Sequence, residues 1–196
     1  MKIGCVSLQL LLVSLLFIDN ANCQYSLEIN TGISALVYDN ITSISVANDN
    51  RISFSPSIGI EGARSYKNNL FSLATSISRH SRESYEIGAI TTINDEVYFV
   101  SSTGFLYTRI FANKLGLSGG LSYLNFFGSI DHLSDSRSLL NSYDVRSNLF
   151  TGDVVLSLEQ KRLRYALAYK YFLGKNRAIS GSYLLEFRIS YFICTR

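Results

Sequence analysis

Apolar and polar residues alternate strictly along residues 25–37, in the stretch YSLEINTGISALV. Leu27 and Ile29 are apolar and Glu28 between them is polar, while Leu36 is an exception to the pattern. Successive side chains of a β-strand point to opposite faces, so this stretch predicts a strand with one apolar and one polar face. Similar stretches recur as far as the C-terminus, and their number and length constrain the fold most.

Eight strands are predicted in this way. Many of them reach ten residues or more, whereas soluble strands most often have about 5–6 residues and a tilted strand needs about 9–11 to cross a bilayer. In one strand both faces are apolar, so its orientation is left open. The predicted strands are 25–37, 51–61, 71–78, 97–111 (the ambiguous one), 115–127, 150–159, 163–171 and 185–191.

The links between these strands alternate in length. The short links are 65–69, 112–114 and 160–162, and the long polar links are 39–50, 79–96 and 128–147. Short turns at one rim and long loops at the other are the plan of an outer-membrane barrel, and lipid forces a sheet to close because it cannot hydrogen-bond an exposed edge. We therefore predict an all-β fold, an eight-stranded antiparallel up-and-down transmembrane β-barrel with both termini in the periplasm.

Residues 1–23 have the features of a secretory signal peptide: Lys2, an apolar run over 6–18 and then small residues. We expect cleavage after Cys23, which leaves the barrel domain as residues 24–196; an alternative is that Cys23 becomes a lipidated N-terminus. Cys194 would then be the single cysteine of the mature chain, without an internal disulfide. The formal net charge of +3 is small and dispersed along the sequence, so nucleic acid is not an expected partner.

The inner face of the predicted barrel is formed largely by Gly, Ser and Ala. Eight strands enclose only enough room for side chains, so a water-filled pore is not expected. Charged residues on this face must pair, because an unpaired buried charge is costly. We expect Arg188 and Glu186 to reach Glu28 and Arg164. The charges assigned to the inner face are Glu28, Glu61, Asp153, Arg164, Lys170, Glu186 and Arg188.

The run FSPSIGIEGARSYKNNLFSLATSISR resembles the strand–short turn–strand of small porin-like (OmpX/OmpA-type) outer-membrane β-barrel domains of Gram-negative bacteria. KLGLSGGLSY and NRAISGSYLLEFRISYF resemble their later strands. The resemblance is one of pattern and covers the whole mature chain. It implies residence in the bacterial outer membrane, contact with its lipid and lipopolysaccharide, and insertion by the barrel-assembly machinery. That machinery reads an aromatic residue near the end of the chain, here Tyr191 or Phe192.

Two histidines limit the search for chemistry. His132 and Ser134 faintly resemble the His-x-Ser of outer-membrane lipid A deacylases, with Asp144 as an imaginable acid. We favour a polar loop at this place instead. His80 is expected on a solvated, charged rim, since no ligands at metal-binding spacing accompany it. No catalytic, cofactor-binding or metal site is therefore predicted.

Two surface features are expected of such a barrel. Three basic residues at the outer rim, Arg79, Arg82 and Lys175, are candidates for contact with anionic lipopolysaccharide. Tyrosines near the predicted strand ends suit the aromatic girdles at the two membrane interfaces. These tyrosines are Tyr25, Tyr38, Tyr66, Tyr171 and Tyr191.

The predicted function is non-enzymatic: a structural, adhesive or ligand-contacting role carried by the long extracellular loops, with an unknown extracellular ligand. One alternative is a lipid A deacylase-like hydrolase. Another is a soluble lipocalin-like carrier, against which the absence of Trp speaks. The last is a narrow channel.

Overall fold

In a computed structural model, residues 24–38, 52–87, 91–111, 114–134, 137–174 and 181–195 are described. The predicted signal peptide and the fate of Cys23 lie outside these residues. The described chain consists of strands and turns. The strands are β1 (Gln24–Tyr38), β2 (Ile52–Tyr66), β3 (Asn69–Ile87), β4 (Thr91–Ile110), β5 (Leu115–Ser134), β6 (Leu139–Gln160), β7 (Leu163–Phe172) and β8 (Gly181–Thr195).

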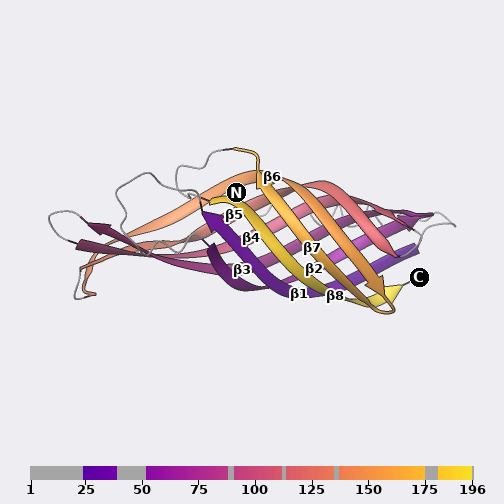
Figure 1. Cartoon of the computed structure of the whole chain (residues 1–196), viewed down its shortest axis with the longest axis horizontal. Coiled ribbons are helices and arrows are strands. Elements are labelled where there is room, and N and C mark those ends of the chain that lie inside the picture. Colours follow the sequence, from indigo (N-terminus) through magenta and orange to yellow (C-terminus); the bar gives the residue numbers. More distant parts are fainter. Residues whose placement is uncertain are drawn as a thin grey trace, which may run out of the picture.

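The eight strands form a closed barrel in which each strand pairs with its neighbours in sequence (Figure 1). All pairs are antiparallel, and β1 closes the ring against β8. Glu28, for example, lies opposite Glu61 of β2 and opposite Phe192 of β8. This ring confirms the predicted fold class and strand order.

Alternating burial along each strand shows which face points into the ring. In β2, Ser53, Ser55 and Ser57 are buried, whereas Phe54 and Ile58 are exposed on the outside. Small inward side chains leave room for a narrow barrel, and apolar outward side chains suit a lipid surround. The outside is thus apolar along most of the ring, as the alternation predicts.

The strand whose orientation the sequence leaves open is β4. Tyr98, Val100 and Leu106 point into the barrel and are buried, and Phe99 and Phe105 are exposed on the outside. Both faces of this strand are apolar because its inner face lines an apolar part of the interior.

Two of the three predicted long loops are in fact long β-hairpins. β3 and β4 remain paired as far as Ile87 and Thr91, and β5 and β6 as far as Leu133 and Leu139. The predictions of loops at 79–96 and 128–147 are therefore wrong for most of their length. Both hairpins project beyond the ring, on the left of Figure 1, away from the short turns. Link 39–50 lies outside the described residues.

The short turns lie at the opposite end, which we call the short-turn end. Lys67, Lys114 and Lys161 stand in these turns with φ of 54°, 61° and 55°. This left-handed conformation favours glycine, because a Cβ crowds the following carbonyl. Each short connection therefore places a lysine where glycine would be less strained.

Candidate functional site

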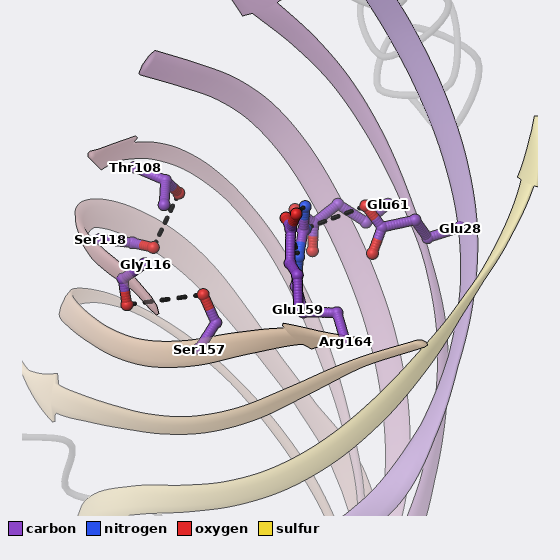
Figure 2. A network of polar contacts seen from close by, with 8 residues as sticks. All are labelled: Glu28, Glu61, Thr108, Gly116, Ser118, Ser157, Glu159 and Arg164. Atoms are coloured by element: carbon purple, nitrogen blue, oxygen red, sulfur yellow. Dashed lines mark hydrogen bonds and ion pairs between the residues drawn. The ribbon is translucent and has the colours of Figure 1, made fainter. Parts of the chain in front are cut away.

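The interior at the short-turn end is organised around Arg164 of β7 (Figure 2). Its Nη1 lies 2.9 Å from Glu28 Oε1 and 3.4 Å from Glu61 Oε1. Its Nη2 lies 2.6 Å from Glu159 Oε1, and its guanidinium stacks over Phe192 at 5.1 Å from the ring centre. Arg164 thus forms ion pairs with three carboxylates, from β1, β2 and β6.

A second ionic cluster occupies the middle of the barrel. Lys170 Nζ lies 3.6 Å from Glu186 Oε2 and 3.8 Å from Asp153 Oδ2, and it donates a hydrogen bond of 2.6 Å to Ser102 Oγ. Arg188 Nε lies 3.9 Å from Glu186 Oε2. Asp153 also accepts hydrogen bonds from neighbouring hydroxyl groups.

All seven charges that were assigned to the inner face are buried. Their partners differ in part from the prediction. Glu186 pairs with both Arg188 and Lys170, whereas Glu28 pairs with Arg164. The register explains the split, because Glu186 lies opposite Ala168 and so reaches the next inward residue of β7, Lys170.

An apolar layer fills the interior at the hairpin end. The prediction of a small, polar inner face is wrong here, because large side chains from β1 and from β4 to β8 meet across the barrel. Phe126 and Phe172 pack edge to face with ring centres 6.1 Å apart. The layer comprises Leu36, Tyr98, Val100, Leu124, Phe126, Val145, Leu149, Phe172 and Leu184.

The prediction that His80 lies on a solvated rim is wrong. It is fully buried in the barrel, where Nδ1 lies 3.1 Å from the carbonyl oxygen of Ser53 and Nε2 lies 3.0 Å from Ser78 Oγ. The alternation of β3 continues to this residue and turns it inward.

The basic residues expected at the outer rim do not all lie on the surface, because the alternation of β3 turns one of them inward. Arg82 is buried, whereas Arg79 is exposed on the outside. Lys175 lies outside the described residues. Arg79 belongs to a row of paired residues that crosses four strands on the outer face: Arg79, Phe99, Phe127 and Arg146. Phe99 and Phe127 stack with ring centres 5.3 Å apart.

The candidate residues of the lipid A deacylase-like alternative lie in the β5–β6 hairpin, but they do not form a catalytic triad. The ring of His132 packs edge to face on Tyr143 at 5.3 Å, and Ser134 Oγ lies 2.5 Å from Ser138 Oγ. No hydrogen bond joins His132 to Ser134 or Asp144 among the contacts of the described residues. Within the same part of the chain, no group of three or more His, Cys, Asp or Glu side chains is placed to hold a metal ion.

The parts of both hairpins that lie beyond the Phe99–Phe127 stack, residues 81–87 and 91–97 together with 129–134 and 137–145, are called the β3–β6 extension below. Backbone pairing joins its four strands, and Arg137 forms an ion pair of 3.2 Å with Glu83 of the other hairpin. Leu139, Leu140 and Tyr143 are 61%, 56% and 51% exposed. The extension is therefore an ordered surface with apolar side chains beyond the lipid-facing part of the barrel.

Aromatic side chains gather near both ends of the outer surface. At the short-turn end, Tyr66 and Tyr191 are exposed, and Arg64 lies over the ring of Tyr25 at 5.8 Å. Tyr171 is exposed near the opposite end. The side chain of Tyr38 lies outside the described part. These placements are those expected of interfacial girdles.

The part of the chain that the structure describes has no helix long and apolar enough to cross a membrane. No protein-family model matches the chain, and no curated protein matches its sequence.

Among solved structures, the chain is similar to Ail, the attachment invasion locus protein of Yersinia pestis, at 12% identity and a TM-score of 0.52, covering 86% of this chain and 97% of Ail. In complex with the heparin analogue sucrose octasulfate, Ail aligns with a TM-score of 0.51 at 12% identity over 87% of this chain and 98% of Ail. Neisserial surface protein A is 13% identical with a TM-score of 0.46, covering 85% of this chain and 94% of its own. The likeness to Ail shows the fold: the chain has the fold of the small outer-membrane β-barrel proteins.

Proposed function

We propose that this protein is a non-enzymatic surface protein of the bacterial outer membrane that contacts an extracellular ligand through the β3–β6 extension. The carrying observation is the set of exposed apolar side chains on the extension: Leu139, Leu140 and Tyr143. Exposed apolar residues that cluster outside a lipid-facing band are typical of an interaction surface. Backbone pairing across four strands holds these side chains in place before any partner binds.

The row of Arg79, Phe99, Phe127 and Arg146 supports contact with lipopolysaccharide at the outer boundary of the lipid. Each arginine stands beside a phenylalanine of the stack. A guanidinium binds phosphate strongly, and aromatic rings favour the interface, so the row suits the phosphorylated headgroup of an anionic glycolipid.

The charge of the extension makes a sulfated polysaccharide an unsuitable ligand. Its described side chains include one buried and one exposed arginine against five carboxylates. The arginines are Arg82 and Arg137, and the acids are Glu83, Asp95, Glu96, Asp131 and Asp144. Ail was solved with a heparin analogue; for this chain we expect a largely uncharged or cationic partner surface.

The proposal is tested by adherence of bacteria that express the full chain to cultured cells and to surfaces coated with extracellular-matrix protein. Replacement of Leu139, Leu140 and Tyr143 by Asn should reduce adherence to the level of bacteria without the protein, because it removes the apolar contact area. A matched variant, Ser142→Ala with Asn148→Ala, keeps these side chains and should adhere as the parent does. Immobilised heparin should retain neither. Equal adherence of the parent and the Asn variant, with both folded, would refute the proposal.

A further inference from the structure

Along the sequence the positive charge looks dispersed, but in the folded molecule it is concentrated at one end. At the short-turn end the exposed charged residues of the described turns and strand ends are all basic: Lys67, Arg109, Lys114, Lys161 and Arg162. The extension at the other end carries more carboxylates than arginines. The small net charge of +3 therefore hides a molecule with a basic rim at one end.

A cavity of about 500 Å³ opens within this rim. Lys67, Lys161 and Arg162 line it, together with Arg164, Glu159 and Phe192. Glu159 is the carboxylate of the lining, and Arg164 holds it at 2.6 Å. The lining therefore contains three further cations that no carboxylate of the lining pairs with: Lys67, Lys161 and Arg162.

The lysines of this lining stand in strained positions. Lys67 and Lys161 both have a positive φ, in turns where glycine would fold more readily. A residue held in an unfavourable backbone conformation is a reason to look for a role of its side chain. Lys114 shares this conformation but does not line the cavity, so the strain presents cations around the whole rim and the cavity singles out Lys67 and Lys161.

Aromatic rings accompany the cations. Lys67 Nζ lies 5.4 Å from the ring centre of Tyr66, and Arg162 Nη1 donates a hydrogen bond of 3.4 Å to the hydroxyl oxygen of Tyr191. Tyrosine rings favour the level of lipid headgroups, and basic side chains at a membrane surface attract anionic lipids. This pairing places the cations where the phosphate groups of a leaflet would lie.

We propose that the cavity at the short-turn end binds a phosphate group, with the headgroup of an anionic phospholipid as its source. Lys67, Lys161 and Arg162 would contact the phosphate oxygens, and Tyr66 and Tyr191 would lie beside the glycerol backbone. The site is at the opposite end from the β3–β6 extension, so it is independent of the adherence proposed above.

The test uses the full folded barrel in uncharged detergent, with phosphatidylglycerol and phosphatidylcholine as probes and native mass spectrometry to count bound lipids. Phosphatidylglycerol should bind more tightly than phosphatidylcholine. Lys67→Gln with Lys161→Gln should weaken its binding by about tenfold or more, because two attracting charges are lost. The matched control is Arg109→Gln with Lys114→Gln, which removes two charges from the same rim but outside the cavity, and it should bind as the parent does.

A heat-dependent mobility shift on a gel shows that each variant is folded before it is compared. Equal losses in the two double variants would overturn the cavity site, and so would equal binding of both lipids by the parent. Inorganic phosphate added as competitor separates the two sources of the group. Displacement of phosphatidylglycerol would show that a free phosphate suffices, and retention would assign the site to the lipid headgroup; both results support a phosphate site.

Discussion

The side chain of Arg164 on β7 contacts side chains of four other strands inside the barrel: β1, β2, β6 and β8. It forms ion pairs with Glu28, Glu61 and Glu159, and Glu28 is completely shielded from solvent. A buried ion pair adds little net stability over apolar residues, but loss of one partner leaves the other charge buried and uncompensated. The stability of the interior at the short-turn end therefore depends on this one guanidinium far more than on any single carboxylate.

Arg164→Gln should lower the free energy of unfolding by about 3–5 kcal/mol, because Glu28 and Glu61 lose their counter-charge. Urea unfolding of the detergent-folded barrel, followed by gel mobility, measures the change. A triple variant, Arg164→Gln with Glu28→Gln and Glu61→Gln, removes the charges together and should recover most of the loss. If the triple variant is no more stable than Arg164→Gln, the cost does not come from uncompensated carboxylates.

Single residues also mark where the sequence pattern is incomplete. Leu36 breaks the alternation of the first strand, and Tyr98 and Val100 make both faces of β4 apolar; all three belong to the apolar layer inside the barrel. The inward position of Arg164 follows from alternation alone. The pairing of Glu186 with Lys170 does not, because it depends on the register between strands and on the stagger of the closed ring.

The strands differ in how far they extend beyond what a membrane requires. A bilayer needs about 9–11 residues of tilted strand, which β7 with 10 residues satisfies, whereas β6 has 22. The sequence predicts the part of each strand that faces lipid, because only there do apolar residues alternate with polar ones. Beyond it polar residues stand on both faces, the alternation fades, and a polar strand resembles a polar loop; the sequence therefore predicts loops at 79–96 and 128–147 where the structure has hairpins.

The outward face of β8 offers a direct test of the lipid-facing assignment. Phe187 lies near the middle of the strand on the outside, and Ile193 lies near its end, where it is exposed beside the cavity. Phe187→Arg should cost about 2–4 kcal/mol in a bilayer, whereas Ile193→Arg should cost about 0–1 kcal/mol, because the cost of arginine falls toward the interface. Folding into lipid vesicles across a urea series measures both. Equal costs for the two substitutions would contradict a membrane-spanning β8.

At the scale of the whole molecule, the interior contains two barriers in series. The ionic cluster around Arg164 lies at the short-turn end, and the cluster around Lys170 lies in the middle of the barrel. The apolar layer with Phe126 and Phe172 lies at the hairpin end. A barrel of eight strands has just enough interior for its own side chains. Ions would have to displace paired charges and then cross an apolar layer, so the described interior offers no ready route for conduction.

The purified barrel in a planar lipid bilayer should therefore show no steady ionic current, under conditions in which a large water-filled porin conducts. Phe126→Ala with Phe172→Ala removes much of the apolar layer and should destabilise the barrel, since each such truncation costs about 3–5 kcal/mol. Current should still be absent from the molecules that remain folded, because the ionic clusters are intact. Steady current through the parent barrel would contradict the sealed interior and favour a narrow channel. Current through the Phe variant alone would show that the apolar layer by itself closes the barrel and that the ionic clusters are permeable.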